Sequence, residues 1–147
     1  MNESRIQNLL IEKENVFSFM QLVACNVYFY QWESDVLMID KSGLAIEFEI
    51  KISKWDYLKD KDKFAKHRAL ASAKNFSDIP SKFYYVVLDE FVKDVLVEDY
   101  CGLIVVSGSG MKPRVTFEKY APELHNEPIS SGDYKKLAIK LSRKLYL

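Results

Sequence analysis

The sharpest alternation of apolar and polar positions in the chain is the run LAIEFEIKI, residues 44–52. Successive side chains of a β-strand point to opposite faces, so the apolar residues at the even positions share one face. The opposite face carries a mostly charged set: Ala45, Glu47, Glu49 and Lys51. We therefore predict a strand here, with Glu49 and Lys51 as neighbours on one side of the sheet.

Further strands are predicted where β-branched and aromatic residues gather between turn signals. They cover residues 21–39, with a polar interruption at 31–34, and then residues 82–88, 102–107 and 114–119. Residues 91–100 are compatible with a helix or a loop, and the glycines within 107–110 indicate a turn.

Apolar residues at helical spacing predict helices over residues 3–14 and 130–147. A charged, alanine-containing stretch over residues 53–75 is predicted as a helix that is broken near His67. We find no internal repeat and no linker, so we expect one domain over residues 1–147. The order of these elements predicts an α/β (α+β) fold in which helices flank a mixed sheet.

The turn that precedes the alternating strand decides which side chains face Glu49. Residues 40–43 read DKSG, a turn sequence. If three residues form the loop, Gly43 occupies the left-handed position and Asp35 lies opposite Glu49. A loop of two residues would turn Asp35 to the other face of the sheet.

The carboxylates of this predicted hairpin indicate a metal site. Carboxylates held close together repel one another unless a cation or a proton relieves them, and oxygen ligands suit Mg²⁺ or Mn²⁺. We expect Asp35 and Glu49 to be the ligands, with Lys51 orienting a water or stabilising charge on a phosphate. Glu33 and Glu47 share the predicted face and are candidates for supporting roles; Glu47 is equally a candidate partner of Lys51 or a surface charge.

These positions resemble the signature of the PD-(D/E)XK nuclease superfamily. In that signature an Asp is followed, across a hairpin, by (Asp/Glu)-X-Lys on the next strand, which corresponds to Asp35 and Glu49-Ile50-Lys51. The likeness spans roughly residues 26 to 125 and is carried by four segments: WESDVLMIDKSGLAIEFEIKISKWDYLKD, KFYYVVLDEF, YCGLIVVSGSG and KYAPELH. These segments look like those of small phage and bacterial members of the superfamily that are related to a DNA-repair branch.

The resemblance implies a restriction-endonuclease-like fold and a metal-dependent endonuclease that hydrolyses phosphodiester bonds in DNA, in phage or bacterial DNA processing or repair. It implies Asp35, Glu49 and Lys51 as the catalytic residues. Many members place a further acidic residue in the N-terminal helix, for which Glu12 and Glu14 are candidates.

Charge and composition limit how such a protein would bind DNA. Lys plus Arg and Asp plus Glu number 21 each, so any attraction to nucleic acid must be local. Cys25 and Cys101 lack the paired spacing of a zinc site, and no run of about 18 apolar residues occurs. We expect a reduced, cytoplasmic protein that does not bind a membrane.

Positive charge gathers in the predicted helix that follows the alternating strand. Its candidates for phosphate contacts are Lys54, Lys59, Lys63, His67 and Arg68. Nearby aspartates dilute this charge, and a solvated helix face is an equal alternative. Trp32 and Trp55 could stack on bases, but packing in the core or the hairpin is the favoured interpretation.

Two other classes of function remain compatible with the sequence. The first is a nucleic-acid-binding module of the same fold without turnover, and the second is a structural or partner-binding protein whose carboxylate face is incidental. The sequence does not decide whether the substrate is DNA or RNA, or whether cleavage is endonucleolytic or exonucleolytic. It also leaves base specificity and the formation of a homodimer open.

Overall fold

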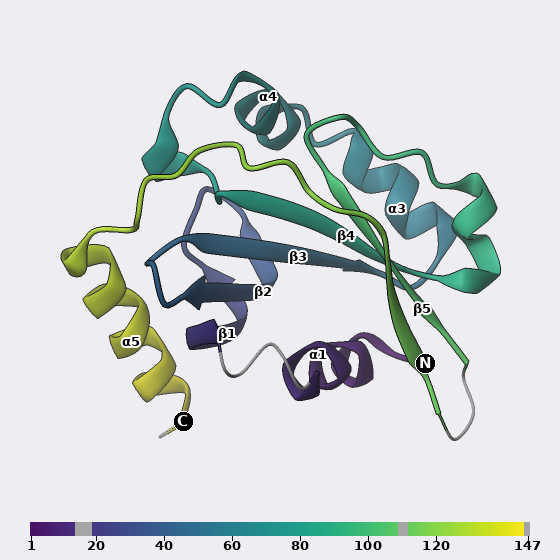
Figure 1. Cartoon of the computed structure of the whole chain (residues 1–147), viewed down its shortest axis with the longest axis horizontal. Helices are drawn as coiled ribbons and strands as arrows, with labels where there is room; N and C mark the ends of the chain where they lie inside the picture. Colours follow the sequence, from purple (N-terminus) through teal and green to yellow (C-terminus); the bar gives the residue numbers. More distant parts are fainter. Residues whose placement is uncertain (14–18, 109–111, 146–147) are drawn as a thin grey trace.

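A mixed β-sheet forms the centre of the computed structural model, which describes residues 1–13, 19–108 and 112–145 (Figure 1). Its strands are adjacent in sequence order: β1 (Met20–Tyr28), β2 (Glu33–Asp40), β3 (Ala45–Lys51), β4 (Lys82–Leu88), β5 (Gly102–Ser107) and β6 (Arg114–Lys119). The three central strands β3, β4 and β5 are parallel, and the other neighbours are antiparallel. The predicted mixed sheet is confirmed.

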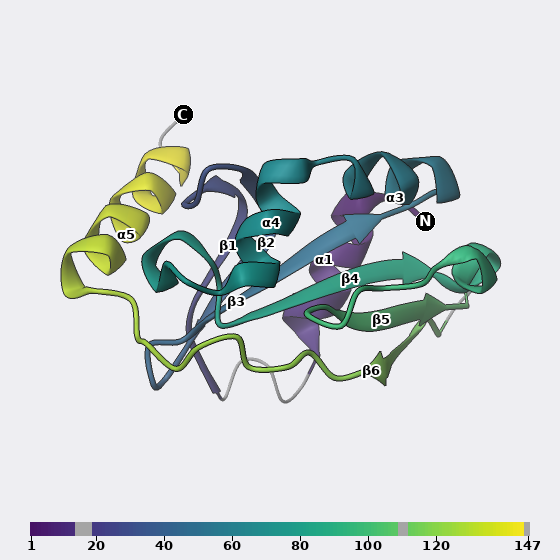
Figure 2. The ribbon, with the colours of Figure 1, turned by 90° about the horizontal axis from the view of Figure 1, so that it is seen from above.

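Helices cover both faces of this sheet (Figures 1 and 2). One face carries α1 (Glu3–Glu12), whose buried Ile6 and Leu10 belong to the main apolar core. The opposite face carries α3 (Lys54–Lys61) and α4 (Phe64–Ser72), which connect β3 to β4. The C-terminal helix α5 (Ser131–Leu145) packs its buried Leu137 against residues of β1, β2 and β3.

The charged helical region is divided at a different point from the one predicted. The side chain of Ser53 caps α3 by accepting a hydrogen bond from the Asp56 N–H at 3.2 Å. The break falls at Asp62 and Lys63, and His67 lies inside α4. Two short 3₁₀ helices, η1 (Phe76–Asp78) and η2 (Asp89–Asp94), complete the connections, so the start of the ambiguous segment 91–100 is helical.

The hairpin between β2 and β3 has the predicted three-residue loop. The Asp40 N–H donates to the Leu44 carbonyl oxygen at 3.0 Å, and Gly43 has a φ of +85°. A Cβ at Gly43 would also lie 2.9 Å from the Pro128 side chain, so this position favours glycine for two reasons. The pairing runs to Val36 opposite Phe48, which brings Asp35 to the place opposite Glu49.

The charged face of β3 is buried, because α3 and α4 cover it. Glu47 is 0% exposed, Glu49 4% and Lys51 7%. Leu70 of α4 belongs to the same core as Phe83 of β4. In the parts of the chain that the structure describes, no helix has both the length and the apolar character needed to cross a membrane.

Candidate functional site

Asp35 and Glu49 lie at the end of the hairpin where β2 and β3 separate. The Asp35 carboxylate accepts a hydrogen bond from the Ile50 N–H at 2.8 Å, so it is fixed beside Glu49 by the backbone of β3. Burial raises the pKa of Asp35 to about 6, and the nearby Glu3 carboxyl adds to the rise. Burial also raises the pKa of Glu49, and the negative charge of Asp35 adds to that rise.

Two lysines counter the charge of Glu49. Lys51 Nζ lies 3.1 Å from Glu49 Oε1, and Lys66 Nζ, from α4, lies 3.6 Å from Glu49 Oε2. Burial lowers the pKa of Lys51, but the carboxylates of Glu49 and Asp60 outweigh that effect, so its pKa is raised overall. Lys51 therefore stays an ammonium in this enclosed site.

Asp60 of α3 is a further carboxylate, and it contacts the same two lysines as Glu49. It is fully buried and lies 3.4 Å from Lys51 Nζ, 3.1 Å from Lys63 Nζ and 3.3 Å from Lys66 Nζ. The Tyr85 hydroxyl of β4 also donates to it. Burial would raise the pKa of Asp60, but the neighbouring His67 and the lysines hold it well below its usual range.

Glu47 occupies a separate polar environment. The Trp32 indole N–H donates to both of its carboxyl oxygens, at 3.0 and 2.9 Å. Complete burial raises the pKa of Glu47 to about 8, and the positive charge of Lys66 opposes the rise. The carboxyl is thus protonated near neutral pH, which weakens the case for a direct metal contact by Glu47.

The other acidic candidates take different positions. Glu33 is exposed at the start of β2, where it pairs with Tyr28 of β1. Glu12 is exposed at the last position of α1, and Glu14 lies outside the described residues. The acidic residue of α1 that approaches Asp35 is Glu3, in the first helical turn, close enough to hydrogen-bond with its carboxyl.

The candidate phosphate contacts separate into an exposed set and an internal residue. Lys54, Lys59, Lys63 and Arg68 are exposed on α3 and α4 or between them. The ring of His67 has both nitrogens engaged: Nδ1 lies 2.7 Å from the Tyr100 hydroxyl, and Nε2 lies 3.0 Å from the carbonyl oxygen of Asp60. The structure therefore places His67 in support of Asp60, with both ring nitrogens engaged inside the protein.

The two tryptophans also differ. Trp32 is half-buried and holds Glu47, as expected for a packing role. Trp55 is 72% exposed in the first turn of α3, so the prediction that it packs in the core or hairpin is wrong. The reason is that α3 turns Tyr57, instead of Trp55, toward the sheet, where its ring meets Tyr85 edge-on.

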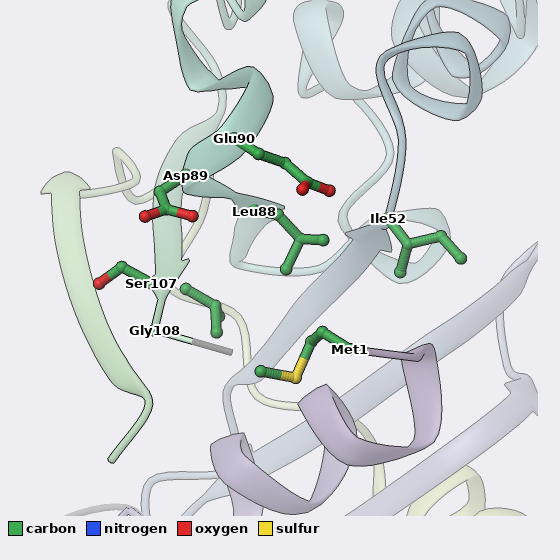
Figure 3. Close-up of a pocket in the computed structure, with 8 residues that line it drawn as sticks. Met1, Ile52, Leu88, Asp89, Glu90, Ser107 and Gly108 are labelled. Carbon is green, nitrogen blue, oxygen red and sulfur yellow. The ribbon is translucent and has the colours of Figure 1, made fainter. Parts of the chain in front are cut away.

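A hollow of about 340 Å³ opens at the carboxyl ends of the parallel strands (Figure 3). Its lining comes from Met1, from the residues that end or follow β3, β4 and β5, and from two acidic side chains, Asp89 and Glu90. This lining includes neither Asp35 nor Glu49. Its charged groups are acidic, so this hollow does not favour an anionic ligand.

The oxygen donors at the hairpin end fit a hard divalent cation with two protein ligands. Glu49 Oε2 is buried and accepts no hydrogen bond in the described structure, and the Asp35 carboxylate is held beside it. Among the described residues, no group of three or more His, Cys, Asp or Glu side chains is arranged to hold a metal. An ion here would complete its shell with water and phosphate oxygens, and the two nearby ammonium groups would keep its binding weak.

Comparison with known proteins bears on the fold. No family model matches the chain, and no curated protein matches it. A solved structure with the same overall arrangement is the SPO1766 protein of unknown function from Silicibacter pomeroyi, at a TM-score of 0.56 and 19% identity. The match covers 84% of this chain and 76% of that one. It supports the mixed α and β architecture and carries no information about activity.

Proposed function

We propose that the protein is a divalent-metal-dependent nuclease that hydrolyses phosphodiester bonds in DNA. One observation carries the proposal: the Ile50 N–H fixes the Asp35 carboxylate beside Glu49, and Lys51 Nζ lies 3.1 Å from Glu49. Two carboxylates and one ammonium at the open end of a hairpin match the residue types that the nuclease signature requires.

Each residue has a role that follows from its position. Asp35 and Glu49 would hold Mg²⁺ or Mn²⁺, and the bound ion would supply a water of lowered pKa and neutralise charge on the scissile phosphate. Lys51, charged and anchored to Glu49, would donate to the phosphate oxygen or the attacking water. Asp35 is the more exposed carboxylate of the pair, so the substrate would enter on its side.

The surface beside the site suits a nucleic acid. Trp55 presents an exposed ring on α3, and Lys54 and Lys59 lie on the same helix. Aromatic rings stack on bases whatever the sequence, and lysines neutralise phosphates. The proposed substrate contact is therefore a strand that crosses α3 with a base against Trp55.

A metal titration of the melting temperature tests the site. We expect Mg²⁺ or Mn²⁺ to raise the melting temperature of the wild type, since the ion relieves repulsion between Asp35 and Glu49 and binds the folded state alone. Asp35→Asn should abolish most of that rise, whereas Asp99→Asn, at an exposed loop position, should retain it. The titration is run with and without DNA, because phosphate oxygens complete the shell of the ion.

Cleavage assays with single-stranded, duplex and branched DNA decide between the candidate functions. Metal-dependent products that disappear in Asp35→Asn support the nuclease. Metal or DNA binding without products would favour the inactive nucleic-acid-binding module. Neither a thermal shift nor cleavage in any condition would favour the structural protein and overturn the proposal.

The exposed ring of Trp55 leads to a second test. Trp55→Ala should weaken binding of single-stranded DNA by about 5- to 150-fold, the effect of losing about 1–3 kcal/mol of stacking on one base. The metal-induced thermal shift should stay unchanged, because Trp55 does not contact the carboxylates. Tyr120→Ala is the matched control, as Tyr120 is 75% exposed but follows the edge strand β6. Equal DNA affinity in all three proteins would exclude stacking at Trp55.

A further inference from the structure

Two carboxylates and two ammonium groups form a closed cluster between β3 and the helices above it. Lys51 contacts Glu49 at 3.1 Å and Asp60 at 3.4 Å. Lys66 contacts the same two acids, at 3.6 Å and 3.3 Å. Each lysine thus bridges both carboxylates, so that opposite charges alternate around the cluster.

Burial makes this arrangement demanding. Glu49, Lys51, Asp60 and Lys66 are all buried. Buried charges are costly unless each is paired and hydrogen-bonded, so losing one member leaves the others poorly compensated. The four groups act as one unit, and a change at Asp60 is transmitted to Lys51 and Glu49.

Asp60 is the better anchored of the two carboxylates. The Tyr85 hydroxyl donates to its Oδ2, and Lys63 Nζ lies 3.1 Å from its Oδ1. His67 Nε2 lies 3.0 Å from both the Asp60 carbonyl oxygen and the Tyr85 hydroxyl. Glu49, in contrast, has one oxygen without a hydrogen bond in the described structure.

We propose that Asp60 is the positioning residue of the site: it keeps Lys51 and Lys66 in place when a divalent ion engages Glu49. This inference rests on the proposed function for its catalytic consequence. An ion bound by Glu49 competes with both lysines for the same carboxylate. Asp60, which belongs to α3 and is held by Tyr85, is not drawn to the ion and retains the two ammonium groups.

The consequence for cleavage is a separation of kcat from KM. In Asp60→Asn the new side chain has nearly the same shape as that of Asp60, but it lacks the negative charge that holds Lys51. We expect kcat to fall about 10- to 100-fold, the usual effect of removing a group that orients a catalytic residue. KM for DNA should change little, because the exposed lysines remain. Asp62→Asn, two residues further on and exposed, should leave both constants unchanged.

The decisive measurement does not need turnover. Competitive acetylation with acetic anhydride at one fixed pH, read by mass spectrometry, reports the reactivity of each lysine amine. The groups that face Lys51 are Glu49 of its own strand, Asp35 of β2, and Asp56 and Asp60 of α3. In Asp60→Asn, Lys51 should be acetylated several-fold faster than in the wild type, because it has lost one of its two carboxylate partners, and Mg²⁺ should enlarge the difference.

The outcomes separate the two proposals. If Lys51 changes its reactivity as expected but the wild type cuts no DNA, the nuclease proposal falls and the role of Asp60 stands. If Asp60→Asn is folded and Lys51 reacts as in the wild type, the role of Asp60 is overturned. Should Asp60→Asn fail to fold, Tyr85→Phe is the second variant, because it removes one donor to Asp60 and leaves every charge in place. It should raise the acetylation rate of Lys51 by less than Asp60→Asn would. An unchanged acetylation rate of Lys51 would again overturn the inference.

Discussion

Lys51→Ala should reduce metal-dependent DNA cleavage by about 100- to 10,000-fold, the range associated with a positioned proton donor or a fixed charge at the reacting group. Lys51 is the ammonium nearest to Glu49 and its pKa is raised, so it keeps its charge throughout the neutral range. The loss should fall on kcat, because exposed lysines of α3 remain available to bind DNA. Steady-state kinetics with Mg²⁺ and a labelled oligonucleotide measure it.

The fold of this variant needs a separate check, because Lys51 is buried between Glu49 and Asp60. Lys66 still contacts both acids, so we expect the chain to fold with a free energy of unfolding lower by about 3 kcal/mol. Lys82→Ala, at the opposite end of the neighbouring strand, is the control. Wild-type kcat in a folded Lys51→Ala protein would remove Lys51 from the mechanism, and an unfolded variant would define it as a structural ion-pair partner.

The sequence predicted the hairpin well because two local rules agree there. The alternation in residues 44–52 determines which side chains share a face, and Gly43 determines the loop length. Together they lead to the pairing that the structure shows, with Val36 opposite Phe48. The sequence left the loop length conditional, because a loop of two residues would have turned Asp35 to the other face. The left-handed Gly43 and the bond from the Asp40 N–H to the Leu44 carbonyl oxygen show that the loop has three residues.

Burial of the charged face was not predictable from the same pattern. A strand with polar residues on one side usually turns that side to water. Here α3 and α4 return over it, and their own charges compensate Glu49 and Lys51. Such pairing depends on the tertiary arrangement of segments that are separate in sequence, and the alternation of one strand contains no information about it.

A signal for Asp60 and Lys66 does exist in the helices. Asp60 follows the buried Tyr57 by three residues, and Lys66 precedes the buried Leu70 by four. Residues at these spacings share a helix face, so each charge lies on the side that packs on the sheet. The abundance of lysine and aspartate around them concealed this pattern and made a solvated helix face an equal interpretation.

Glu3, in the first turn of α1, is an acidic residue of the N-terminal helix that approaches Asp35. Glu12 and Glu14 were the candidates, but the first turn of α1 is the part that meets the hairpin end. Gln7, one turn after Glu3, donates its side-chain amide to the Asp35 carbonyl oxygen at 3.0 Å, which fixes that orientation. The direction in which a helix crosses a sheet follows from tertiary packing, so residue spacing within the helix did not reveal it.

Glu47→Gln should stabilise the protein at alkaline pH and have little effect near pH 5. The pKa of Glu47 is raised to about 8 by complete burial, whereas the same carboxyl ionises near pH 4.5 in the unfolded chain. In the wild type, the stability that depends on a protonated Glu47 carboxyl is therefore fully present below about pH 4.5. It is lost as the pH rises through about 8. Glutamine is neutral at every pH, and its side-chain oxygen can still accept the Trp32 N–H.

Urea unfolding of both proteins at pH 5 and pH 9 measures this effect. One pKa unit corresponds to about 1.4 kcal/mol, so the free energy of unfolding of Glu47→Gln, relative to the wild type, should rise by about 4 kcal/mol between the two pH values. Asp35 and Glu49 titrate in both proteins, so the double difference isolates Glu47. Glu33→Gln, exposed on β2, should show no such pH dependence. An equal stability difference at both pH values would show that Glu47 is ionised in the folded protein, in which case it would repel Glu49 and return as a candidate metal ligand.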